Sequence, residues 1–290
     1  MREKLNAYYQ LTKPGVLYGN VLTGAAGFLL AAGVAKHYDW LLFLAAIGGM
    51  TLVIAAACVI NNYLDRDIDS VMQRTKKRPS VTGAVKGGAM VTYGVILLVF
   101  GIGILYLWTN LLVVAIGIIG FVTYVWLYGA LSKRRSIHGT AVGSISGAMP
   151  IAGGYAAVSG HVDFGLVIVF LILFFWQFPE FYSIAIYRRK EYAAAKVPVM
   201  SVVKGVPSTI KQIFVYTILY VLSTLSLTTF RYTGWIYMVV MAAAGAYWIM
   251  LAYEGLSTKK PEAWARKMFR FSMYDILLLC VMLAVGPLLP

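Results

Sequence analysis

Three polar residues at a constant spacing, Asn61, Asp65 and Asp69, are the strongest indication of chemistry in the sequence. In a helix, residues four positions apart turn by only about 40° and rise by about 6 Å, so the three side chains would share one face. Asp67 would point away from it. Two oxygen ligands one turn apart suit Mg²⁺, which keeps several waters and is commonly shared with substrate phosphates. The spacing therefore predicts a Mg²⁺ site on Asn61, Asp65 and Asp69.

Basic residues follow these carboxylates directly in the sequence. Lys and Arg bind phosphate oxygens, so carboxylates beside them favour a site for Mg²⁺ and a diphosphate. We expect the substrate to be bound by Arg74, Lys77 and Arg78. The simpler interpretation is a polar loop that caps the end of a helix.

A second charged cluster covers residues 187–192, Tyr-Arg-Arg-Lys-Glu-Tyr. Glu191 is expected to supply a further carboxylate to the metal, and Lys190 and Arg188 to bind the departing diphosphate. Lys190 and Glu191 thus join the first cluster as predicted catalytic residues. An ordinary basic flank of a membrane helix would look the same.

Two further residues are predicted to contact substrate. Glu180 lies inside an apolar run beside Gln177 and Pro179. Ionisable groups inside a membrane span are usually functional or paired, and a proline frees a backbone carbonyl in the helix. His138 begins another apolar run, next to a pair of arginines.

The elements that position these residues are expected to be membrane-spanning helices. The chain has 290 residues and is 60% hydrophobic but only 12% charged, about half the charged fraction of a soluble domain. Apolar runs long enough to cross a bilayer cover residues 14–35, 40–64, 87–132, 136–162, 164–187, 212–230, 232–253 and 271–290. The third run has a polar break at 108–110 and counts as two spans. The sequence therefore predicts an all-α polytopic membrane protein with nine transmembrane helices.

The charge distribution predicts how these helices are oriented. The net charge is +14, and with a cytoplasmic N-terminus all 25 basic residues except Lys36 and Arg231 fall on the inner side. By the positive-inside rule the N-terminus is cytoplasmic and the C-terminus outside. The basic charge then reflects insertion in the cell (inner or plasma) membrane, with the site toward the cytoplasm, and predicts no nucleic-acid partner.

Two long inner loops, residues 63–88 and 187–211, carry the two charged clusters and follow the second and sixth spans. We expect a single transmembrane domain over residues 1–290. The separation of four spans favours two four-helix halves, 10–132 and 136–256, with a ninth helix at 270–290.

The spacing of Asn61, Asp65 and Asp69, together with nine spans, resembles the UbiA-type intramembrane prenyltransferases. Residues 12–15, 19–20, 61–78, 136–160 and 176–199 are similar to the branch of that family that modifies haem. The resemblance implies Mg²⁺-dependent transfer of a farnesyl group from farnesyl diphosphate to a vinyl group of haem B, giving haem O and diphosphate. The allylic cation that this transfer implies would need an aromatic ring face, and the candidates are Tyr63, Tyr124, Tyr128 and Tyr187. It also implies partners in the biogenesis of haem–copper oxidases.

Two positions depart from the pattern of that branch. Glu180 stands where the branch usually has His, and this bears on contact with haem. Glu191 stands where it usually has Asp, which keeps a carboxylate.

Three alternatives remain at this point. The first is the same transfer to an aromatic quinone precursor, and the second is a non-catalytic assembly factor for an oxidase. The third is a secondary transporter, in which charged binding residues lie near the bilayer midplane on broken helices. Carboxylates clustered at the inner ends of the spans favour an enzyme, with Glu180 as the exception.

Overall fold

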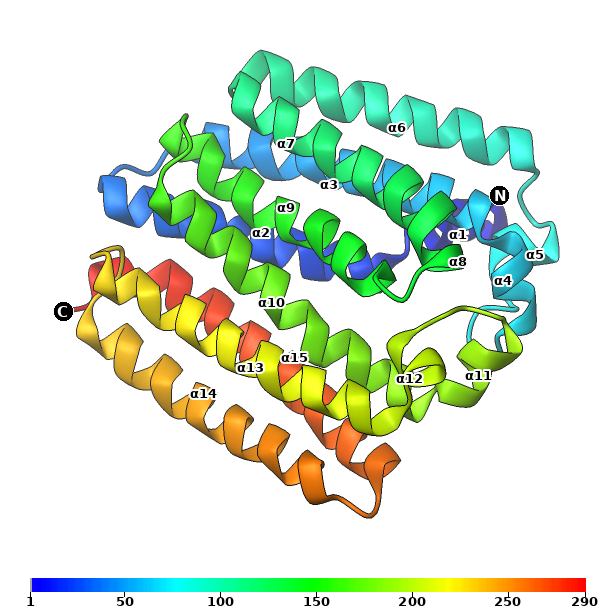
Figure 1. The fold of residues 1–290 in the computed structure, drawn as a ribbon. Helices are drawn as coiled ribbons and strands as arrows, with labels where there is room; N and C mark the ends of the chain where they lie inside the picture. Colours follow the sequence, from blue (N-terminus) through cyan, green and yellow to red (C-terminus); the bar gives the residue numbers. More distant parts are fainter. Residues whose placement is uncertain (1) are drawn as a thin grey trace.

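The structure, a computed structural model, describes residues 2–290. Over these residues the chain is helical and forms a single layered bundle (Figure 1). Nine helical segments in this part of the chain are long and apolar enough to cross a membrane, which confirms the predicted number of spans. They are α2 (Pro14–Ala35), α3 (Trp40–Leu64), α6 (Gly87–Trp108), α7 (Leu111–Val122) continued by η1 (Thr123–Ser132) and α8 (Lys133–Arg135), α9 (Gly139–Ser159), α10 (Phe164–Tyr187), α13 (Val206–Thr229), α14 (Trp235–Glu254) continued by η2 (Gly255–Ser257), and α15 (Pro261–Val285) continued by η3 (Gly286–Leu288).

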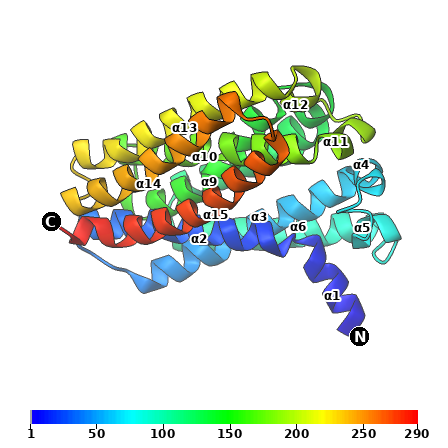
Figure 2. The same cartoon turned by 90° about the horizontal axis from the view of Figure 1, so that it is seen from below.

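Short helices complete the chain at one end of the bundle. They are α1 (Arg2–Leu11), α4 (Arg66–Val71), α5 (Pro79–Thr82), α11 (Arg189–Ala194) and α12 (Met200–Val203). The N-terminus lies at this end and the C-terminus at the other (Figure 1). Figure 2 shows α1 extending away from the rest of the bundle.

The polar break in the third apolar run separates α6 from α7. Asn110 Oδ1 accepts the backbone N–H of Val113 at 3.1 Å and caps α7. The Asn110 amide also donates to the carbonyl oxygen of Ala156 in α9 at 2.9 Å. One side chain thus ends the turn and ties it to a third helix.

Two spans begin earlier in the sequence than the hydropathy predicts. Helix α13 starts at Val206 rather than 212, and α15 at Pro261 rather than 271. Basic residues such as Lys211 and Arg270 interrupt the apolar run but are good helix formers, so the helix extends beyond its apolar part. Each helix has a proline in its first turn, where the missing N–H costs nothing.

Four helices, α2, α9, α10 and α15, contact one another in a closed ring. Helices α3, α6 and α7 lie on one side of it, and α13 and α14 on the other (Figure 1). Helices α2 and α9 approach so closely that a Cβ on Gly154 would lie 1.9 Å from the carbonyl oxygen of Gly24. Small residues permit this backbone contact, which is a common way to pack helices in membranes.

The two long inner loops pack against each other. Ile68 and Met72 of the first loop form a small apolar core with Val197 of the second. The loops therefore cover the end of the bundle that carries the short helices. This end, which the charge distribution predicts to face the cytoplasm, is called the inner end. Helix α9, the first span of the predicted second half, packs against α2 and α7 of the predicted first half as well as against α10. The division into halves 10–132 and 136–256 therefore stays a prediction.

Candidate active site

Asn61, Asp65 and Asp69 lie where α3 passes into α4. Helix α3 ends at Leu64, yet the helical hydrogen-bond spacing continues across the junction. The Asp65 N–H donates to the Asn61 carbonyl oxygen at 2.9 Å, and the Asp69 N–H to the Asp65 carbonyl oxygen at 2.8 Å. The three residues therefore stay in register, and none is more than 2% exposed.

Each buried carboxylate is paired with a cation from another segment. Lys133 Nζ of α8 lies 2.5 Å from Asp65 Oδ2. Arg78 Nη1, just before α5, lies 2.6 Å from Asp69 Oδ2. Burying a charge is costly unless it is paired, so these contacts stabilise the two carboxylates inside the protein.

Lys13 provides a third cation, although it was not among the predicted site residues. Its φ of 52° places it in the left-handed region, between α1 and α2. Lys13 Nζ donates to Asn61 Oδ1 and to Tyr124 Oη, the latter at 3.3 Å. Removal from water lowers the pKa of Lys13 to about 8. A basic residue just before a span looks like any topological flank, so only the surrounding Thr-Lys-Pro-Gly sequence could have indicated it.

The side chains fit a divalent metal of the Mg²⁺ type. Asp65 Oδ1 is buried and has no hydrogen-bond partner among residues 2–290, and the nearest cation to it, Arg134 Nη2, lies 3.9 Å away. Within the same residues, no three His, Cys, Asp or Glu side chains gather closely enough to enclose a metal. Mg²⁺ needs no such cage, since one or two carboxylates with waters and substrate phosphates suffice.

The structure does not bring Glu191 together with Asp65 and Asp69. Arg188 Nη1 lies 2.8 Å from Glu191 Oε1, one helical turn away on the same segment, and holds that carboxylate on the second loop. Glu191 Oε2 is buried and has no partner in the described part of the chain. The second loop contacts the first through Val197 and Tyr192, which pack with Ile68 and Met72. Burial raises the pKa of Tyr192, and the nearby positive charges of Arg74, Lys133 and Arg188 oppose this.

The remaining predicted substrate contacts lie around the rim of this inner end. Tyr187 is enclosed by two guanidinium groups, with the Cζ atoms of Arg188 and Arg266 5.6 and 4.8 Å from its ring centre. This conformation leaves little of its ring face free for a substrate cation. Four other residues are exposed, namely Arg74, Lys77, Lys190 and His138.

Two of the four candidate tyrosines border the buried site. Tyr124 and Tyr128 lie in η1, a π-helical segment at the inner end of the fourth span, and their rings stack with centres 5.8 Å apart. Gly129 in the same segment faces Asn61, because a Cβ there would lie 2.8 Å from Asn61 Nδ2. Tyr63 instead stacks beneath Arg66 Cζ at 4.3 Å, outside the site. Such π-helical turns are rare and frequently occur at functional sites.

Glu180 lies inside α10 and forms no ion pair within residues 2–290. Trp176 and Ser183 share its helix face, and their Nε1 and Oγ atoms are buried without partners in that part of the chain. The Gln177 amide is held by the Ser144 carbonyl oxygen at 3.1 Å. Helix α10 thus carries unpaired polar groups inside the bundle.

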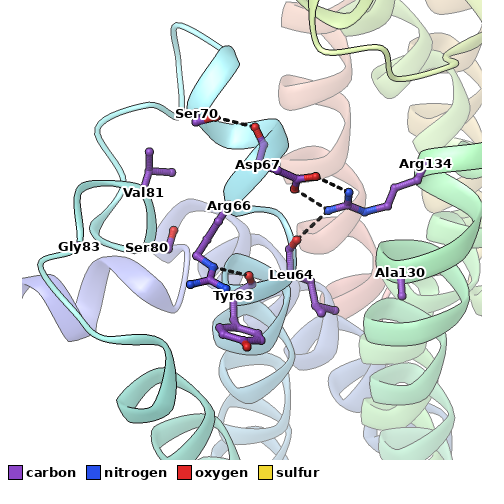
Figure 3. Close-up of a pocket in the computed structure, with 10 residues that line it drawn as sticks. All are labelled: Tyr63, Leu64, Arg66, Asp67, Ser70, Ser80, Val81, Gly83, Ala130 and Arg134. Carbon is purple, nitrogen blue, oxygen red and sulfur yellow. Dashed lines mark hydrogen bonds and ion pairs between the residues drawn. The ribbon is translucent and has the colours of Figure 1, made fainter.

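Asp67 points away from the buried carboxylates, as its position in the helix predicts. Its side chain is 64% exposed and forms a bidentate pair with Arg134, with contacts of 2.6 and 2.8 Å. The hydrogen bonds from Arg134 lower the pKa of Asp67 to about 2. Asp67 faces an open surface pocket of about 720 Å³ on the other side of α4 (Figure 3).

Comparison with known proteins places this geometry in a family. Residues 20–274 match the model of the UbiA prenyltransferase family. The chain belongs to that family. Two curated relatives named protoheme IX farnesyltransferase cover almost the whole chain. The one from Photorhabdus laumondii is 43% identical, over 99% of this chain and 97% of the relative. The one from Yersinia enterocolitica is 44% identical, over 97% and 94%.

Solved structures share the fold. One, from work on digeranylgeranylglyceryl phosphate synthase in membranes, has a TM-score of 0.81 at 19% identity and covers 98% of this chain and 99% of its own. A UbiA homolog from Archaeoglobus fulgidus bound to GPP and Mg²⁺ has a TM-score of 0.73 at 13% identity, covering 96% and 99%. This member of the UbiA family is therefore a multi-pass membrane enzyme, a prenyltransferase. The transporter and the non-catalytic assembly factor are excluded.

Proposed function

We propose that this protein transfers a farnesyl group from farnesyl diphosphate to a vinyl group of haem B, giving haem O and diphosphate. The observation that carries the proposal is its identity of 42–44% to relatives named protoheme IX farnesyltransferase, over 97–99% of the chain. These relatives match almost the whole chain, so the matches include both long loops.

We assign the metal to Asn61, Asp65 and Asp69. The buried Asp65 Oδ1, which accepts no hydrogen bond, supports this assignment. Glu191 is retained as a ligand candidate because its Oε2 also accepts none. Mg²⁺ bound there would stabilise the negative charge that the leaving diphosphate gains.

The cations of the site would hold the diphosphate oxygens. Lys133 and Arg78 already place positive charge beside the two carboxylates, and Lys13 does so beside Asn61. Charge-assisted hydrogen bonds to phosphate are strong and directional, particularly from arginine. The outer oxygens would be held by Arg74, Lys77, Arg188 and Lys190, with Tyr187 and His138 at the rim.

The transfer itself breaks the bond between the allylic carbon and the diphosphate oxygen, and the diphosphate leaves with the electron pair. Tyr124 and Tyr128 offer ring faces beside the allylic cation. A vinyl carbon of haem B forms the new carbon–carbon bond, and water captures the resulting cation and releases a proton. The helices exclude other water until then. We place the acceptor against α10, where Glu180 would face it.

The inner end of the bundle is proposed to face the cytoplasm of the cell (inner or plasma) membrane, because it carries nearly all basic residues. Haem–copper oxidase assembly is the proposed destination of the product.

The test is product analysis with purified protein in lipid nanodiscs. With farnesyl diphosphate, haem B and Mg²⁺ we expect a haem O mass, and about a 100-fold loss for Asp69→Asn, which removes one preorganised charge. Asp67→Asn, on the opposite face of α4, is the matched control and should stay close to the wild type. Turnover of an aromatic acid with no haem product would instead establish a quinone-precursor acceptor. Undiminished transfer by Asp69→Asn would overturn the metal site.

A further inference from the structure

The surface pocket behind the buried carboxylates has no role in the proposed reaction. It lies between the α4–α5 loop and η1, at the inner ends of two spans (Figure 3). Its volume of about 720 Å³ is within the usual size range of ligand sites. Its lining includes Tyr63, Leu64, Arg66, Asp67, Ser80, Ala130 and Arg134.

Arg66 presents an oriented guanidinium to this pocket. Its Nε donates to the Tyr63 carbonyl oxygen at 3.0 Å, and its Cζ lies 4.3 Å from the centre of the Tyr63 ring. These two contacts fix the plane of the group. Its terminal nitrogens form no hydrogen bond within residues 2–290, and the side chain is exposed. Arg66 is therefore an oriented donor whose terminal N–H groups are accessible to a ligand.

A buried hydroxyl also lacks a partner in this pocket. Ser80 is 5% exposed, and its Oγ has no hydrogen-bond partner in the described residues. Buried polar groups in native proteins are nearly always paired with protein or water, so the Ser80 hydroxyl takes its partner from the pocket and is available to a ligand bound there.

Arg134 and Asp67 neutralise each other across the pocket. Arg134 donates to both oxygens of Asp67 and to the Leu64 carbonyl oxygen at 2.7 Å, so its donors are largely used. The charged residues of the wall therefore leave one net positive charge, that of Arg66. A monoanion matches this charge, whereas diphosphate would require several more cations.

The pocket wall is apolar on the side of the spans. Leu64 ends α3, and Ala130 lies in η1, both at the inner ends of membrane helices. A ligand with one phosphate diester charge and an apolar body satisfies both parts of the wall.

We propose that this pocket binds the headgroup phosphate of an anionic phospholipid, between Arg66 and Ser80, with the lipid body along Leu64 and Ala130. The pocket and the buried carboxylates share one neighbour, Arg134, whose Nη2 lies 3.9 Å from Asp65 Oδ1. The proposal does not depend on which acceptor the enzyme uses.

The test is native mass spectrometry of the full-length protein, released from detergent after titration with phosphatidylglycerol or phosphatidylcholine. We expect the wild type to bind phosphatidylglycerol about tenfold more tightly than phosphatidylcholine. Arg66→Gln and Ser80→Ala should lose that preference. Lys76→Gln, an exposed basic residue on the same loop, is the matched control and should keep it.

Three outcomes would overturn the proposal. The first is an unchanged preference in Arg66→Gln when its thermal unfolding equals that of the wild type. The second is equal binding of the two lipids by the wild type. The third is displacement of the lipid by millimolar inorganic phosphate, which would make the pocket a site for soluble anions.

Discussion

The ion pair of Asp65 and Lys133 allows structural and catalytic roles to be separated by mutation. Asp65→Asn leaves the Lys133 ammonium, whose side chain is 18% exposed, without the carboxylate at 2.5 Å. Breaking a buried pair by removing one partner costs about 3–5 kcal/mol, and the remaining exposure of Lys133 places the expected loss of stability at about 3 kcal/mol. The same change removes a charged ligand of the proposed metal site, which should lower transfer by about 10²–10³-fold.

The double variant Asp65→Asn/Lys133→Met distinguishes the two effects. It removes both charges, so no buried ion remains unpaired, and stability should return to within about 1 kcal/mol of the wild type. Transfer should be no higher than in Asp65→Asn, because the proposed metal ligand is still missing and a cation proposed to hold the diphosphate is missing as well. The measurements are denaturant unfolding in mixed micelles and product formation from farnesyl diphosphate, each on all four members of the cycle.

Two results would refute this reasoning. Recovery of transfer together with stability would show that Asp65 serves only as a counter-ion for Lys133. A double variant that is as unstable as Asp65→Asn would show that the unpaired ammonium is not the source of the loss.

Two further predictions concern helix packing and the third cation. Gly154→Ala should destabilise the bundle by about 2 kcal/mol despite alanine's better helix propensity, because its Cβ would collide with a carbonyl oxygen of α2. Gly103→Ala, inside α6 with nothing within 4 Å of the added Cβ, should not destabilise the bundle in the same unfolding assay and should gain up to about 1 kcal/mol. Lys13→Met should lower transfer by about 10–100-fold, because it removes the donor that orients Asn61. Lys36→Met, at the opposite end of α2 and also in the left-handed region, should not, and equal rates for the two variants would contradict the role of Lys13.

Features that depend on local physics were predictable from the sequence. A bilayer requires about 20 apolar residues per helix, so hydropathy alone indicates nine spans and the break near Asn110. The common direction of Asn61, Asp65 and Asp69, and the opposite direction of Asp67, follow from helix periodicity.

Features that depend on contacts between distant segments were not predictable. Lys133 is 68 residues from Asp65 in the sequence and Lys13 is 48 from Asn61, and both resemble ordinary basic flanks of spans. Glu191 was expected at the metal because it is a carboxylate in the loop 187–211, which follows the sixth span as the loop 63–88 follows the second. In this structure Glu191 pairs with Arg188, three residues before it, and does not join Asp65 and Asp69.

The π-helical segment η1 sets the direction in which Lys133 leaves the fourth span. A π turn closes its hydrogen bond one residue later than an α turn, so each residue of η1 turns the chain by less than the roughly 100° of an α-helix. The same ten residues wound as an α-helix would give Lys133 a different direction around the helix axis. The hydrogen-bond pattern between Thr123 and Ser132 is therefore itself part of how Lys133 reaches Asp65.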